Sequence, residues 1–196
     1  FSIDFADTWI AVADGIVVDR GRGVMWHQCA SPATRIIDAE GAYLAPAFVD
    51  IHTHGGGGHN VEDGPDHLGA ILDVHRAHGT RALILSYVSD TIAGLASSLR
   101  VGAGLARENP AVLGLHAEGP FLSPDFKGAH SPEVLTAPTP EAVETILEAA
   151  GGQLAQVTLA PELPGAPEAI ARFADAGVSV AVGHTAADYA QTMRAF

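Results

Sequence analysis

YLAPAFVDIHTHGGGG, residues 43–58, is the stretch of sequence that decides the fold. Its apolar run over residues 44–51 predicts a short, fully buried β-strand. Because alternate side chains of a strand share a face, His52 and His54 are expected to point the same way at its end. The four glycines that follow permit a sharp turn and the close approach of another group. Paired imidazoles at the mouth of a buried strand favour a divalent metal site. Two solvated histidines in a flexible loop are the alternative.

The chain after residue 43 alternates between apolar strands and helical patterns, which predicts a parallel sheet covered by helices. Thr185 and Asp188 predict a capping box for the last helix. The strands are predicted at 44–51, 81–88, 111–116, 156–160 and 178–183, and the helices near 65–78, 90–107, 139–150 and 166–176, with a last helix opening at 186. Five such units fit two architectures, an open doubly wound sheet or the first part of a (β/α)8 TIM-like barrel.

Polar residues at the ends of alternate strands favour the barrel. His52 and His54 follow the first strand, His116 and Glu118 the third, and His184 the fifth. The carboxyl ends of strands converge at the mouth of a closed barrel, whereas in an open sheet they are spread along an edge. We therefore predict an α/β fold in which residues 44–196 supply about five β/α units of a barrel.

A carboxylate with imidazoles from other strands makes a nitrogen and oxygen site that suits zinc, iron(II), manganese or cobalt. The alternatives are that Glu118 caps a loop, that His116 is a hydrogen-bonded core residue, and that His184 is structural. His59 follows the glycines, and the sequence does not decide whether it reaches the site. The other histidines lie on predicted surface or helical faces and receive no role: His27, His67, His75 and His78.

Residues 1–43 read as a small β-element of short strands and turns. TWIAVADGIVVD predicts a hairpin with Asp14 and Gly15 at its turn. GVMWHQ (23–28) and ATRIIDA (33–39) are interpreted as two further strands. Nothing in this element suggests chemistry.

Composition narrows the class of function. The 196 residues carry 23 acidic against 10 basic side chains, for a net charge of −13, which argues against nucleic acid and anionic membrane surfaces as partners. A single cysteine permits neither an intrachain disulfide nor a cysteine-based zinc site. Without a membrane-length apolar run or a basic leader segment, a soluble cytoplasmic protein is expected. No serine-nucleophile or phosphate-loop motif is present, which leaves metal-activated water as the mechanism.

The Pro-x-Phe-x-Asp-x-His-x-His pattern over residues 46–54 resembles the amidohydrolase superfamily. Three further segments narrow the resemblance to its N-acetylglucosamine-6-phosphate deacetylase family. They are LGLHAEGPFLSPDFKGAH (113–130), VTLAPE (157–162) and VGHTAADY (182–189). The likeness covers most of residues 40–196. It also suits the N-terminal element, because the barrel of this family carries a small β-sandwich built from both chain ends.

The resemblance implies a metal-dependent hydrolase that removes the acetyl group of N-acetylglucosamine 6-phosphate. It implies Glu118 and His184 as metal ligands and His52 and His54 as ligands of a second metal. It further implies one or two ions, with zinc favoured over iron, manganese and cobalt. Ala129 and His130 match the segment that contacts the sugar, and His116 is expected as a partner of the ligands.

The family pattern extends past this sequence. A further metal histidine, the catalytic Asp and much of the substrate pocket would lie beyond Phe196, so we expect the sequence to be part of a longer protein. Lys127 is the only lysine, and the resemblance implies that a neighbouring subunit and the remaining chain supply the phosphate contacts, in a homodimer. The alternatives are an amidohydrolase for a cyclic amide or another N-acyl amino sugar, or a silent binding or scaffold protein if the chain ends at residue 196.

Overall fold

The structure is a computed structural model that describes residues 8–196. The chain divides into two compact units, a first that ends at Pro46 and a second from Ala47 to Phe196. The first seven residues of the predicted N-terminal element lie outside the described residues. Among the residues that are described, no helix is long and apolar enough to cross a membrane.

The described part of the first unit is built on one antiparallel hairpin, β1 (Thr8–Ala13) and β2 (Ile16–Arg22). Asp14 and Gly15 form its turn with φ values of 51° and 77°, the left-handed pair that a two-residue hairpin of this type requires. This confirms the predicted hairpin. The predicted β-sandwich remains a prediction.

The two further strands predicted in this unit are wrong. Residues 23–28 form a 3-10 helix, η1 (Gly23–Gln28), and residues 33–39 lie in no strand. Gly23 takes a left-handed φ of 63°, which turns the chain away from the line of β2. Short apolar runs of this kind do not distinguish a strand from an irregular segment, because a strand also needs a partner to pair with.

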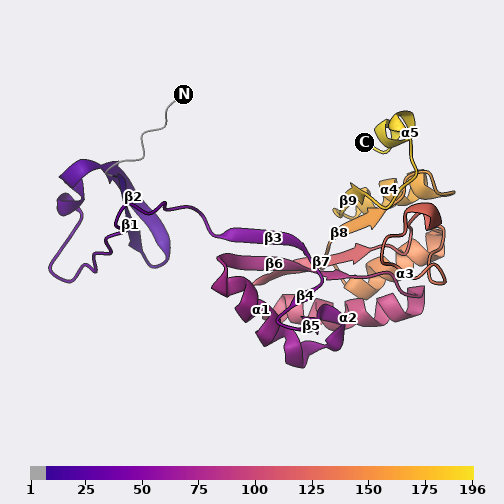
Figure 1. The fold of residues 1–196 in the computed structure, drawn as a ribbon, viewed down its shortest axis with the longest axis horizontal. Helices are drawn as coiled ribbons and strands as arrows, with labels where there is room; N and C mark the ends of the chain where they lie inside the picture. Colours follow the sequence, from indigo (N-terminus) through magenta and orange to yellow (C-terminus); the bar gives the residue numbers. More distant parts are fainter. Residues whose placement is uncertain (1–7) are drawn as a thin grey trace. The chain divides into compact units, whose positions relative to one another are not determined.

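The second unit alternates strands and helices, as predicted (Figure 1). Its strands are β3 (Phe48–Thr53), β4 (Gly55–Gly56), β5 (His59–Asn60), β6 (Thr80–Tyr87), β7 (Val112–Glu118), β8 (Leu154–Leu159) and β9 (Ser179–Val182). Its α-helices are α1 (Leu68–Ala77), α2 (Ile92–Glu108), α3 (Pro140–Ala150), α4 (Ala166–Asp175) and α5 (Tyr189–Arg194). Short 3-10 turns are η2 (Val61–Asp63), η3 (Pro65–His67) and η4 (Pro124–Phe126).

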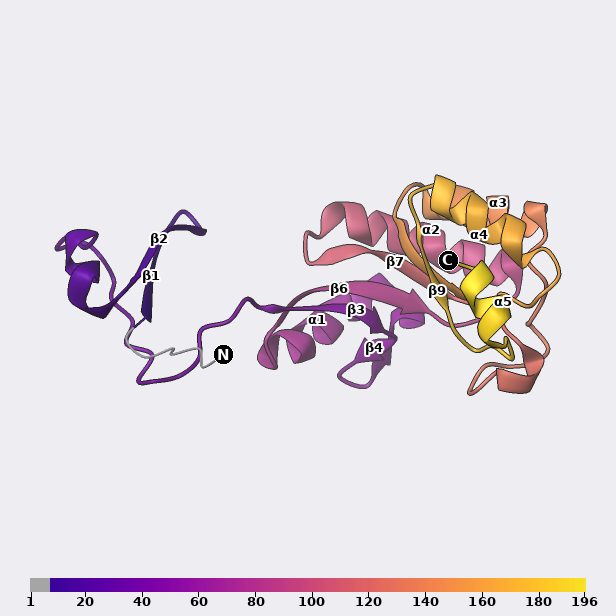
Figure 2. The ribbon, with the colours of Figure 1, turned by 90° about the horizontal axis from the view of Figure 1, so that it is seen from above.

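The five long strands form one parallel sheet in the order β3-β6-β7-β8-β9. This spatial order follows the chain, so every crossover moves in the same direction. Because such crossovers are right-handed, the connecting helices are expected on one face of the sheet. A doubly wound sheet instead reverses its order at a switch point. The sequential order therefore fits part of a (β/α) barrel, and Figures 1 and 2 show the helices following one another along the sheet.

The core lies between this sheet and its helices. Leu85 and Leu115 of the sheet and Leu99 of α2 are almost completely buried, and Phe173 of α4 extends the same core. The first turns of α2 and α3 are capped by the side chains of Thr91 and Thr139.

Two local predictions need correction. The predicted first strand is not fully buried, because β3 is the first strand of the sheet and, within residues 8–196, pairs only with β6; Phe48 and Ile51 are 67% and 55% exposed. The last helix begins later than expected, at Tyr189. Asp188 is its N-cap and Gln191 completes the capping box, so the predicted box from Thr185 is wrong.

Candidate metal centre

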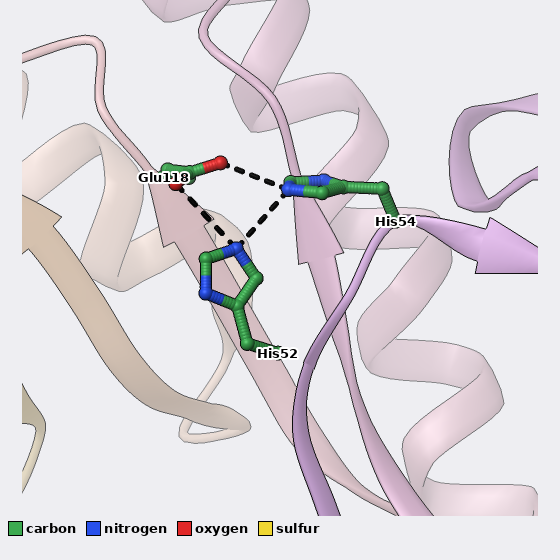
Figure 3. Close-up of side chains that lie close together, drawn as sticks. All are labelled: His52, His54 and Glu118. Carbon is green, nitrogen blue, oxygen red and sulfur yellow. Dashed lines mark hydrogen bonds and ion pairs between the residues drawn. The ribbon is translucent and has the colours of Figure 1, made fainter. Parts of the chain in front are cut away.

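Five predicted site residues lie together, four of them at the carboxyl ends of three strands and His130 on the loop after β7. Figure 3 shows three of them, His52, His54 and Glu118. The buried carboxylate of Glu118, at the end of β7, is the centre of this group. Nε2 of His54 lies 2.8 Å and Nε2 of His52 lies 3.5 Å from its two oxygens. Nε2 of His184 lies 3.2 Å and Nε2 of His130 lies 3.5 Å from it. We call these five residues the Glu118 cluster.

The cluster contains two groups of three that can hold a metal ion. One is His52, His54 and Glu118, and the other is Glu118, His130 and His184. In each, the ligand atoms lie within 4.8 Å of one another. Glu118 belongs to both groups, so one bridging carboxylate can serve one or two ions.

The glycine run after β3 forms a tight turn directly behind the two histidines of that strand. Gly55 has a φ of 146°, and a Cβ there would lie 2.0 Å from the backbone oxygen of His59. A Cβ on Gly56 would lie 2.6 Å from Val74 of α1. Only glycine permits this close packing of the turn against its own hairpin and against α1. The group that approaches the glycines closely, as the sequence predicted, is therefore helix α1 of the same chain.

Hydrogen bonds to backbone carbonyls fix the tautomers of two imidazoles. Nδ1 of His54 lies 3.0 Å from the oxygen of Ser86, and Nδ1 of His184 lies 3.0 Å from that of Phe126. A carbonyl oxygen can only accept, so each Nδ1 carries the proton and donates it. In the neutral rings, Nε2 then presents its lone pair toward Glu118. Lone pairs facing a carboxylate need a proton or a cation between them, which is the environment of a metal ligand.

His130 is prepared for a different role. The backbone N–H of Ser89 donates to its Nδ1 at 3.2 Å. In the neutral ring the proton is therefore on Nε2, which faces Glu118 at 3.5 Å. Burial, above all, lowers the pKa of His130 below its ordinary 6.5, which favours this neutral form. The arrangement makes His130 a hydrogen-bond donor at the site.

The electrostatics of the cluster keep Glu118 ionised. Burial alone raises the pKa of its carboxyl, but the hydrogen bond from His54 and the charges of His52, His54 and His130 outweigh burial and lower it to about 2. The same hydrogen bond raises the pKa of His54 above 6.5. A proton therefore competes with a cation for Nε2 of His54.

His116 lies directly beneath the cluster and is fully buried. Its Nδ1 is 2.9 Å from the hydroxyl of Ser86, its Nε2 is 2.9 Å from that of Thr158, and its ring packs edge-on against His52. Burial lowers its pKa to about 4, with the charge of His52 as the next cause. His116 thus links three neighbouring strands below the ligands.

Several residues at the site were not foreseen. Ser86 accepts the N–H of Thr53 and connects β3 to His116. His75, assigned no role from the sequence, contacts the hydroxyl of Thr53 at 3.2 Å and the carbonyl of Gly55 at 3.0 Å. Spacing along the chain contains no signal for these contacts, because they depend on which strands and helices become neighbours.

Ala129, a predicted site residue, and His59, whose role the sequence left undecided, lie outside the ligand groups. Ala129 is exposed on the loop after β7, next to His130. His59 stacks on His67 with ring centroids 4.3 Å apart, and its Nδ1 lies 3.9 Å from Asp63. His59 is therefore engaged with its own loop.

A parallel sheet wound in one direction, with a carboxylate and imidazoles at its strand ends, fits part of a (β/α) barrel with a candidate metal centre. The sequence pattern of the amidohydrolase family matches residues 43–196. The chain belongs to this family.

Similar proteins include two sugar-phosphate deacetylases. N-acetylgalactosamine-6-phosphate deacetylase of Escherichia coli O157:H7 is 33% identical over 169 residues, which cover 82% of this chain and 44% of the relative. N-acetylglucosamine-6-phosphate deacetylase of Caenorhabditis elegans is 35% identical over 164 residues, covering 77% of this chain and 39% of the relative.

A solved structure gives the same result. A mutant of N-acetyl-D-glucosamine-6-phosphate deacetylase from Mycobacterium smegmatis, in complex with N-acetyl-D-glucosamine-6-phosphate, superposes with a TM-score of 0.87 at 38% identity. The match covers 96% of this chain and 48% of that one. The chain thus spans less than half the length of these relatives.

Proposed function

We propose that this chain carries the metal-binding part of an amide hydrolase that removes the acetyl group from N-acetylglucosamine 6-phosphate, giving glucosamine 6-phosphate and acetate. The observation that supports this most strongly is the meeting of Glu118, His54 and His184 from three separate strands. The names of the relatives support the substrate.

We assign the metal to Glu118 and His184, with His52 and His54 as ligands of a second ion. Zinc is the metal that this ligand set favours, with iron, manganese or cobalt as alternatives. When bound, such an ion supplies a Lewis acid that polarises a carbonyl and lowers the pKa of water. We further propose that the rest of the barrel, an N-terminal β-sandwich and a homodimer complete a cytoplasmic enzyme.

The chain's own residues orient the reactants. The carbonyls of Ser86 and Phe126 hold Nε2 of His54 and of His184 toward Glu118. His130 offers an Nε2–H beside Glu118, where a carbonyl or hydroxyl oxygen of the sugar can accept it. Ala129, next to it on an exposed loop, presents little bulk to a sugar at this edge.

The test is acetate release by the purified protein from N-acetylglucosamine 6-phosphate and from the unphosphorylated sugar, before and after removal of metal by a chelator. We expect release that needs the phosphate, stops without metal and returns on adding zinc. The Glu118→Gln variant should be inactive, while Glu148→Gln, an exposed site on α3, serves as the matched control. Metal-independent release, or none from any N-acetyl sugar, contradicts the proposal.

N-acetylgalactosamine 6-phosphate is a second candidate substrate. It is supported by the relatives in Escherichia coli and Shewanella, whose names specify the galactose isomer. The two sugars differ only in the orientation of one hydroxyl group. The ratio of kcat/KM for the two phosphorylated sugars decides between them.

A further inference from the structure

The backbone of His184 has an unusual conformation that must be held in place. Its φ is 50°, in the left-handed region that residues other than glycine seldom adopt. Such a conformation is unfavourable for a residue that has a Cβ atom. His184 lies two residues after the end of β9 at Val182. The chain turns at His184, and the imidazole ring of this residue points toward Glu118.

Hydrogen bonds hold His184 itself and the residue before it. The N–H of Gly183 donates to Leu159 at 3.2 Å, which continues the pairing of β9 with β8. The carbonyl of His184 accepts the N–H of Ser123 at 2.9 Å. Its ring donates from Nδ1 to Phe126. These contacts leave open what holds the chain immediately after His184.

Glu162, three residues past β8, holds that segment through both of its oxygens. The hydroxyl of Thr185 donates to Oε2 at 2.5 Å, and the N–H of Ala186 donates to Oε1 at 2.6 Å. The oxygen of Thr185 also accepts the N–H of Ala187 at 2.8 Å. One carboxylate thus fixes the two residues that follow the imidazole.

The carboxylate is charged when it does so. Burial raises the pKa of Glu162, but the hydrogen bonds from Thr185 and Ala186, together with further ones, outweigh burial and lower it. Hydrogen bonds to an ionised acceptor are shorter and roughly twice as strong as neutral ones.

We infer that Glu162 is a positioning residue of the metal centre: it clamps Thr185 and Ala186 and so holds His184 in the left-handed conformation that aims Nε2 at the metal. The inference rests on the proposed role of His184 as a ligand. It assigns a task to the segment 157–162 that is separate from the ligands themselves.

The first experiment measures zinc affinity by competition with a chelator in the wild type, Glu162→Gln and Thr185→Val. Loss of a partner that orients a ligand typically weakens metal binding by about 10–100-fold. We expect Glu162→Gln to fall in this range. Thr185→Val removes one of the two hydrogen bonds to Glu162, together with the one that Thr185 accepts from Ala187, and should lose less because Glu162 still holds Ala186. The visible spectrum of the cobalt-loaded protein should change in both variants, while Glu148→Gln leaves affinity and spectrum unaltered.

The second experiment asks whether Glu162 acts through His184. In a His184→Ala background, adding Glu162→Gln should weaken zinc binding by no more than about twofold, because residues that act as one unit are not additive. A general loss of structure would instead lower affinity to a similar extent in both backgrounds. Thr185→Val keeps the shape of the side chain and carries the test if Glu162→Gln does not fold.

Unchanged zinc affinity and an unchanged cobalt spectrum in both Glu162→Gln and Thr185→Val would overturn the inference, as would full additivity with His184→Ala or a wild type that binds no metal. These outcomes differ from failure of the proposed function, which is read from acetate release. A protein that binds zinc through His184 and Glu162 but releases no acetate keeps the inference and loses the substrate.

Discussion

Replacing Glu118 by glutamine removes the negative charge that four imidazoles surround, while keeping the size of the side chain. In the folded protein the pKa of this carboxyl lies near 2 instead of its ordinary 4.5, which corresponds to about 3 kcal/mol of folding free energy at neutral pH. Because the pKa is lowered on folding, this contribution is present above about pH 4.5 and is lost as the pH falls toward 2.

We therefore expect metal-free Glu118→Gln to lose up to about 3 kcal/mol of stability at pH 7, measured by urea unfolding in the presence of a chelator. The same substitution should weaken zinc binding by more than the roughly 100-fold that loss of an outer-shell partner costs, because a direct ligand is removed. Elemental analysis after dialysis measures the bound metal. Glu148→Gln is the control for the lost charge. If Glu118→Gln keeps wild-type stability and a full complement of zinc, the reasoning about the cluster is wrong.

Three further predictions concern the framework around the site. Gly102→Ala should destabilise the protein by roughly 1–3 kcal/mol, because the new Cβ would lie 2.3 Å from the hydroxyl of Tyr87. On the same helix, the Cβ of Gly104→Ala has no neighbouring atom within 4 Å, so this variant should stabilise the protein by about 0.5–1 kcal/mol. Thermal unfolding compares the two variants. Ser86→Ala leaves the backbone N–H of Thr53 and Nδ1 of His116 without a partner and should cost about 1–3 kcal/mol in urea unfolding. The pKa of His116 falls to about 4 on folding, so metal-free protein should lose about 3 kcal/mol of unfolding free energy as the pH falls from 6.5 to 4. His116→Gln should abolish this loss. A difference in stability between wild type and His116→Gln that does not change with pH would contradict the prediction.

Much of the second unit was predictable because its elements carry strong local signals. The apolar strands, the Thr139 cap and the residues at the strand ends are all features of neighbouring positions in the sequence. Placing polar residues after alternate strands was sufficient to predict that His54, Glu118 and His184 meet. The strand order then separated a barrel from a doubly wound sheet.

What the sequence did not predict depends on neighbours in space. Residues 23–28 have an apolar pattern that fits a strand, yet they form a 3-10 helix. The exposure of β3 follows from its place in the sheet, which the composition of the strand does not encode. Ser86 and Glu162 acquire their roles only when other strands bring Thr53 and Thr185 beside them. Serine and glutamate are too common for their identity alone to indicate such roles.

The position of β3 in the sheet has a consequence for how a bound ion would affect the chain. This strand leads to His52 and His54 but, among the strands that the structure describes, is hydrogen-bonded to β6 alone, whereas Glu118 and His184 lie at the ends of β7 and β9. An ion shared among these residues would act as a cross-link between strands that are not adjacent, closing long loops of the chain much as a disulfide does. Such a cross-link would keep β3 from fraying at the edge of the sheet. The bound ion and the folded chain would therefore stabilise each other.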